Sequence, residues 1–190
     1  MISKITTKMI GALAALLILC GAPAHTALAA DGQIELVIGT GSIKGKIFAM
    51  GNGVATAVAL GGKGVAIYNY ATKGAKDNLK RISKKKRAIN LAAVPAKSLA
   101  KAGAKQLKAI SGLMSLGTHK GDTVLLVVRN KAPKGVSKSA YAKAVGEVVA
   151  VLNSAAAAKM IKREWSGWSP ASGAGAFKSA GVKRHAAAAM

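Results

Sequence analysis

Twice in this chain, an apolar segment typical of a β-strand runs into a turn of Thr and Gly and then into a segment with helical spacing. The first case spans residues 34–60, with the turn at residues 40–42. The second spans residues 64–82, with the turn at residues 72–75 and Thr72 as the expected N-cap of the helix. Successive units of this kind place their strands in parallel and their turns at the same edge of a sheet. The repeated pattern predicts an α/β fold.

The rest of the chain continues the alternation of strands and helices. Further strands are predicted at residues 88–95, 107–114 and 123–130, and further helices at residues 97–103, 137–152 and 153–165. This order favours a mainly parallel sheet flanked by helices. No linker divides the chain after residue 30, so we expect one α/β domain over residues 30–165. Residues 166–190 are rich in Gly, Ala and Ser and are expected to form a C-terminal tail.

Residues 1–29 have the pattern of a signal peptide. A basic start precedes an apolar core at residues 9–19, and Ala27-Leu28-Ala29 supplies small residues for cleavage near Ala29 and Ala30. The apolar core is shorter than the ~20 residues that a membrane-spanning helix needs. We therefore expect an exported protein, periplasmic or extracellular. Because the single cysteine lies in this segment, the mature domain is expected to have no disulfide.

The chain is strongly basic, with 29 Lys and Arg against six Asp and Glu and a net charge of +23. Such a charge attracts anionic polymers, for example nucleic acid or lipopolysaccharide. The strongest cluster, residues 80–87, lacks neighbouring aromatic residues on which bases could stack. We expect no sequence-specific binding of nucleic acid, while non-specific binding of polyanions stays open. General adaptation to an acidic exterior also stays open, because a fold with few carboxylates has few groups to protonate as the pH falls.

The first turn does not have the spacing of a nucleotide-binding loop. A P-loop has four residues between its first glycine and Gly-Lys-[Ser/Thr], whereas five separate Gly39 from Gly45. A Rossmann loop needs G-x-G-x-x-G and an acidic residue about 20 positions later, and both are missing here. His119 and His185 have no partner at metal-ligand spacing, and the acidic residues form no close pair. We expect no enzyme, no cofactor and no bound metal.

Each turn is instead suited to a small anion. A strand followed by a glycine turn and a helix start presents backbone N–H groups and the positive end of the helix dipole. Thr40 and Ser42 add hydroxyl groups to the first turn. A turn that needs only the flexibility of glycine has the same sequence, so this alternative stays open for either turn alone. Two such turns at one sheet edge favour a binding pocket.

The residues of both turns resemble a known family. "TGSIKGKIFAMG" (residues 40–51) is similar to the motif T-G-[GS]-x-x-G-x-Y-[YF]-P-x-G of TAXI-family solute-binding proteins, the extracytoplasmic receptors of TRAP transporters. "TKGAKDNL" (residues 72–79) is similar to their T-x-G-[SA]-x-[ED]-N-L. Ile47 and Ala49 stand where the motif has tyrosine and proline, and residues 131–136 stand where the family inserts a second lobe.

The resemblance implies a single lobe of a periplasmic-binding-protein-like fold. It implies that this lobe binds a small organic anion, a carboxylate or an amino acid, and delivers it to a TRAP membrane component without any chemistry. The residues expected to face the ligand are Thr40, Gly41, Ser42, Phe48, Thr72, Lys73, Gly74, Ala75 and Asn78. The alternative function is a basic periplasmic or surface protein that binds anionic polymers through its general charge.

Overall fold

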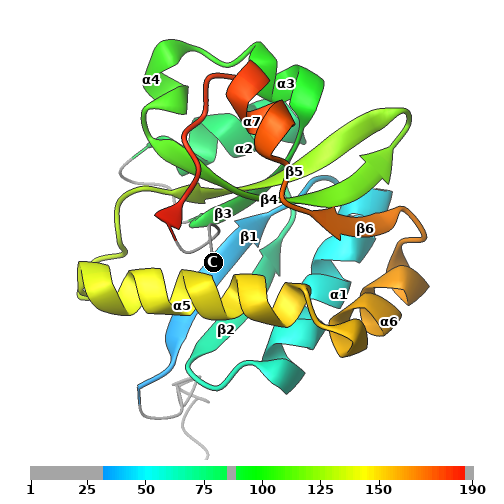
Figure 1. Ribbon diagram of the computed structural model, residues 1–190, viewed down its shortest axis with the longest axis vertical. Helices are drawn as coiled ribbons and strands as arrows, with labels where there is room; N and C mark the ends of the chain where they lie inside the picture. The colour runs from blue at the N-terminus through cyan, green and yellow to red at the C-terminus, as the bar shows by residue number, and fades with distance from the viewer. Residues whose placement is uncertain (1–31, 85–88, 187–190) are drawn as a thin grey trace, which may run out of the picture. The chain divides into compact units, whose positions relative to one another are not determined.

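Six strands form one sheet in the computed structural model, which describes residues 32–84 and 89–186 (Figure 1). The sheet has the order β2-β1-β3-β5-β4-β6. The strands are β1 (Ile34–Gly39), β2 (Val65–Tyr70), β3 (Leu91–Pro95), β4 (Ile110–His119), β5 (Asp122–Arg129) and β6 (Trp168–Ala171). The expected signal peptide, residues 85–87 of the basic cluster and residues 187–190 lie outside the described residues. The predicted α/β class is confirmed.

The sheet is mixed, so the prediction of a mainly parallel sheet is wrong. β1 is parallel to both β2 and β3, whereas β5 is antiparallel to β3 and β4, and β6 is antiparallel to β4. The reason is the tight connection between β4 and β5, which can join only antiparallel neighbours. Lys120 and Gly121 form this connection with φ angles of 50° and 71°, as in a hairpin turn.

Helices cover both faces of the sheet. One face carries α1 (Lys46–Gly61), α5 (Lys138–Leu152) and α6 (Ala155–Glu164), and the other carries α2 (Ala75–Ile82), α3 (Ala96–Ala100), α4 (Ala104–Leu107) and α7 (Ala174–Ser179). Successive residues of β5 point to opposite faces, so Leu126 joins the core under α1 and Val127 the core under α2. The two faces therefore have separate hydrophobic cores.

The helices α5 and α6 begin where the sequence predicts. The Ser137 hydroxyl accepts the N–H of Ala140, and the Ser154 hydroxyl accepts the N–H of Ala157, each at 3.1 Å.

Within the described part of the chain, no single helix is long and apolar enough to cross a membrane. The pair α5 and α6 meets that criterion together, with a bend of 75° between them.

The segment after residue 165 is part of the sheet and the core, which corrects the expected tail. β6 pairs with β4, and the side chains of Trp168 and Phe177 are 1% and 0% exposed. This segment packs closely because β4 contains glycine where a side chain would collide. A Cβ on Gly112 would lie 2.5 Å from the Phe177 ring. The abundance of Gly and Ala around Phe177 gives no sequence signal that this ring is part of the core.

Replacing Phe177 tests whether this C-terminal segment stabilises the domain. We expect Phe177→Ala to lower the free energy of unfolding by ~3–5 kcal/mol, because it removes a fully buried ring and leaves a cavity. Urea denaturation measures the change. The exposed neighbour gives the control, since Lys178→Ala should change the same quantity by less than ~0.5 kcal/mol. Equal midpoints for the two variants would contradict the packing described.

Candidate functional site

The two Thr/Gly turns lie side by side at one edge of the sheet. β1 and β2 are parallel neighbours that end level with each other, at Gly39 and Tyr70. The N–H of Thr40 donates to the carbonyl of Tyr70 at 3.3 Å, and the N–H of Thr72 donates to the carbonyl of Gly41 at 2.8 Å. These bonds join residues 40–45 and 71–75 into one unit, which we call the turn pair.

Asn78 supports the turn pair from inside the protein. Its side chain is fully buried, and its Nδ2 donates to the carbonyls of Gly39, Thr40 and Ala93 at 3.1, 3.2 and 3.0 Å. The Oδ1 atom is also buried, with no hydrogen-bond partner among the described residues. A side chain that ties β1 to β3 in this way is a positioning residue. The structure therefore places Asn78 beneath the turns, away from any ligand on their outer side.

Asn69 has a related role that the sequence analysis missed. Its Oδ1 accepts the hydroxyl of Thr40 at 2.8 Å, and its Nδ2 donates to the carbonyl of Phe48 at 2.8 Å and to Oδ1 of Asn52 at 2.7 Å. It thereby connects the end of β2 to the first turn and to α1. Helix α1 comes close here because residue 51 is glycine, where a Cβ would lie 2.5 Å from Asn69 Oδ1. A polar residue inside the apolar strand VAIYNY was the available signal.

A carboxylate of the chain itself already occupies the second turn. Asp77 Oδ2 accepts the N–H of Lys73 at 3.2 Å and the Nε–H of Arg81 at 2.7 Å. The N–H of Gly74 donates to the Thr72 hydroxyl at 3.2 Å. The N-cap of α2 is Gly74, so the expected capping position of Thr72 is two residues too early. The carboxylate of Asp77 therefore lies at the positive end of α2.

The first turn, in contrast, keeps its donors. The N–H groups of Gly41 and Ser42 and the Ser42 hydroxyl have no acceptor among the described residues. Gly41 is buried, yet a Cβ built on it would meet no atom within 4 Å. Helix α1 starts after Gly45 with no side-chain cap and no acidic residue in its first turn. An anion at this turn would find free N–H groups, a hydroxyl and the positive end of a 16-residue helix.

The nine predicted site residues thus fall into different positions. Seven of them belong to the turn pair: Thr40, Gly41, Ser42, Thr72, Lys73, Gly74 and Ala75, the last of which begins α2. Phe48 is half-buried in the first turn of α1, and Asn78 lies beneath the turns.

Four hollows of about 890, 670, 330 and 380 Å³ on the described surface are lined by residues other than these nine. In the same part of the chain, no three His, Cys, Asp or Glu side chains gather to hold a metal ion. The arrangement presents hydrogen-bond donors to an anion.

The support given by Asn78 can be tested by a substitution of similar size. We expect Asn78→Leu to lower the free energy of unfolding by ~1–3 kcal/mol, because it leaves buried carbonyls of β1 and β3 without a donor. Chemical denaturation measures this. The exposed Asn153 is the control, and Asn153→Leu should stay within ~0.5 kcal/mol of the unchanged protein. An unchanged stability of Asn78→Leu would show that this amide does not hold the turns.

Comparison with known proteins assigns no family to this chain. No protein-family model matches it, and no curated protein matches its sequence. What the turn pair can bind follows from its own amides, hydroxyls and open space.

Proposed function

We propose that this protein binds a small organic anion, a carboxylate or an amino acid, at the first turn of the turn pair. The observation that carries the proposal is the difference between the two turns. At the second turn, the carboxylate of Asp77 accepts a backbone N–H and lies at the start of a helix. No Asp or Glu occurs between Glu35 and Asp77, so the first turn has no such carboxylate from its own segment. A ligand carboxylate would take the corresponding position there.

The charge around the first turn favours the same ligand. Lys44, Lys46 and Lys73 are exposed on the turns and at the start of α1. Exposed cations of this kind attract anions over several ångströms and raise the rate of association, although each contributes little affinity in water. The free N–H groups would then provide the short-range selectivity for an oxyanion.

The wider role in the proposal comes from the sequence resemblance. We regard the domain as one half of a periplasmic-binding-protein-like fold, exported to the periplasm or the cell exterior and feeding a TRAP-type membrane component. The parallel arrangement of β2, β1 and β3 puts the first turn at the carboxyl edge of these strands. Ligands of open α/β sheets bind at such edges, which supports this choice of site.

Gly41→Ala tests the site without disturbing the fold. The added methyl group meets no atom within 4 Å and enters the space beside the free N–H groups. We expect this variant to weaken the binding of a small carboxylate about tenfold or more, while its stability changes by less than ~1 kcal/mol. Calorimetric titration with a panel of dicarboxylates and amino acids measures the affinity.

Gly175→Ala is the matched control, because its added methyl group also meets no atom within 4 Å and lies on α7, outside the turn pair. It should bind the carboxylate as the unchanged protein does. If no member of the panel gives heat or a thermal shift with the unchanged protein, the proposal fails. It also fails if Gly41→Ala binds as tightly as Gly175→Ala.

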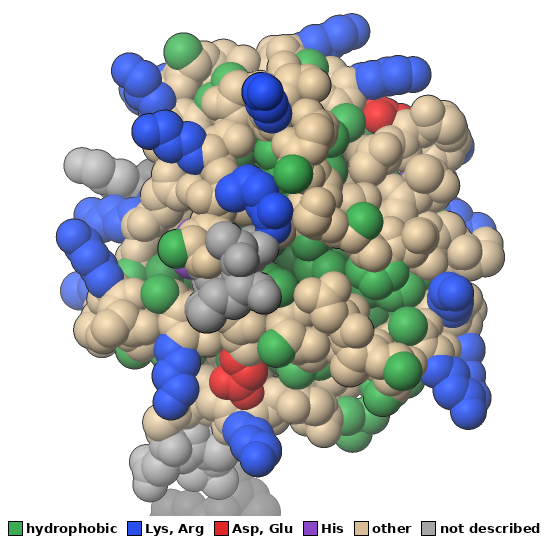
Figure 2. Space-filling view, viewed as in Figure 1, with side chains coloured by type: hydrophobic (Ala, Val, Ile, Leu, Met, Phe, Trp, Pro, Cys, Tyr) green, Lys and Arg blue, Asp and Glu red, His purple; other side chains and the backbone are tan. Residues whose placement is uncertain are grey.

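A second candidate function is non-specific binding of anionic polymers. Figure 2 shows Lys and Arg side chains spread over the visible face, with few acidic side chains between them, in keeping with the net charge of +23. This distribution favours attraction by the whole protein over a defined contact.

A salt titration tests this second candidate. For DNA or lipopolysaccharide we expect the logarithm of the association constant to fall steeply and linearly with the logarithm of the salt concentration. For DNA we also expect no preference for sequence. Binding insensitive to salt would contradict this candidate.

A further inference from the structure

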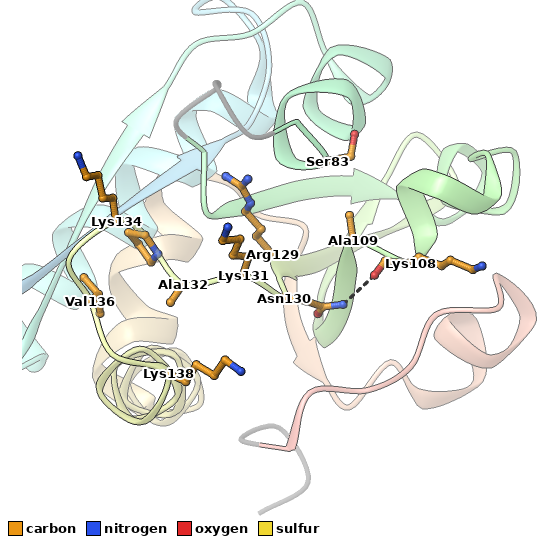
Figure 3. A pocket seen from close by; sticks show the side chains of 11 residues that line it. Ser83, Lys108, Ala109, Arg129, Asn130, Lys131, Ala132, Lys134, Val136 and Lys138 are labelled. Atoms are coloured by element: carbon orange, nitrogen blue, oxygen red, sulfur yellow. Dashed lines mark hydrogen bonds between the residues drawn. The ribbon is translucent and has the colours of Figure 1, made fainter.

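A hollow of about 890 Å³ lies where β5 ends and α5 begins (Figure 3). It is lined by the connection between these elements, by the start of β4 and by Ser83 after α2. Because β5 is antiparallel to β3, this end of β5 lies at the amino end of β3. The turn pair lies at the carboxyl ends of β1 and β2. None of the residues that line the hollow belongs to the turn pair, so the hollow is a different site from the one proposed above.

The lining of the hollow is strongly basic. Its charged members are all cations and come from three parts of the chain: Lys108, Arg129, Lys131, Lys134 and Lys138. In Figure 3, Arg129 and Lys131 project to the same side and Lys138 extends inward from the start of α5, while Lys108 and Lys134 point outward at the two flanks. Cations gathered around one concavity repel one another unless an anion lies between them. The arrangement thus favours a ligand with several negative charges.

The backbone beneath these side chains is held in place. Asn130 donates from Nδ2 to the carbonyl of Lys108 at 3.1 Å, accepts the Ser111 hydroxyl at 2.6 Å and donates its N–H to the carbonyl of Ala109 at 3.0 Å (Figure 3). The Tyr141 hydroxyl donates to the carbonyl of Arg129 at 3.1 Å, and burial raises the pKa of that hydroxyl, which keeps its proton. A fixed backbone reduces the entropy lost when a ligand binds.

Helix α5 adds a further positive contribution. It has 15 residues, its first residue Lys138 lines the hollow, and its first turn contains no acidic residue. The positive end of its dipole therefore lies at the hollow without an internal counter-charge. The remaining wall is made of Ala109, Ala132, Pro133 and Val136. None of the described residues that line the hollow has an aromatic ring on which a nucleic-acid base could stack.

We propose that this hollow is a binding site for a compact anion that carries two or more phosphate groups. The guanidinium of Arg129 can hold one phosphate through two parallel hydrogen bonds, and the ammonium groups of Lys131 and Lys138 can contact a second. A single carboxylate would leave most of this charge unpaired. A free oligophosphate and a lipid headgroup with two phosphates present the same chemistry.

Tripolyphosphate is the probe for the free anion, titrated by calorimetry at fixed salt concentration. The hollow variant carries Arg129→Gln, Lys131→Gln and Lys138→Gln. The matched control carries Lys97→Gln, Lys159→Gln and Lys178→Gln, which are exposed, lie outside the hollow and remove the same net charge. We expect the hollow variant to lose about tenfold or more in affinity and the control less than about threefold. Thermal denaturation checks that both variants are folded.

Equal losses in the two variants would overturn the proposal, because general charge would then explain the binding. The proposal would also be overturned if the protein bound neither tripolyphosphate nor vesicles that contain a lipid with two headgroup phosphates. The vesicles are phosphatidylcholine with or without a lipid whose headgroup carries two phosphates, and binding that requires this lipid and the intact hollow identifies the lipid as the source. Tighter, hollow-dependent binding of single-stranded DNA would replace the proposal by a nucleic-acid site. Gly41→Ala should leave tripolyphosphate binding unchanged, so this site and the carboxylate site fail independently.

Discussion

The side-chain amide of Asn78 joins three parts of the fold, and the geometry of both turns depends on it. Its Nδ2 contacts the carbonyls that end β1 and a carbonyl within β3, from a position on α2. Carbonyl groups buried at strand ends need donors, because water does not reach them. With Asn78 in place, the chain can leave the sheet at Thr40 and present the outward N–H groups of Gly41 and Ser42.

Most of the few carboxylates near the turns and helix starts accept hydrogen bonds from backbone N–H groups. Asp77 accepts the N–H of Lys73, Asp122 that of Lys97, and Glu147 those of Lys63 and Gly64. Acidic side chains used in this way stabilise loops and helix starts but neutralise few lysines. Excess positive charge is therefore left at places without an acid, including the first turn and the hollow at the start of α5. Both proposed binding sites lie where this positive charge has no acidic neighbour in the first turn of the helix.

Part of the candidate site could be read from the sequence. Thr40, Gly41 and Ser42 follow a recognisable strand and precede a helix, and this order predicts free N–H groups at a sheet edge. The acceptor role of Asp77 in the second turn depends on the backbone geometry around Gly74, and the sequence analysis missed it because it took Thr72 as the N-cap. The hollow could not be predicted from the sequence, because the pairing of β4 and β5 brings Lys108 and Lys131 together. Its charge depends on long-range contacts.

The sequence by itself determined the local elements. Short runs of apolar residues placed β1 and β5 almost to the residue, and the hydroxyls of Ser137 and Ser154 marked the starts of two helices. These features depend on near neighbours in the chain. Only the tertiary structure decided that the sheet is mixed and that Phe177 belongs to the core. Strand direction and close packing depend on which distant segments meet, and a glycine opposite a ring has no local pattern that reveals it.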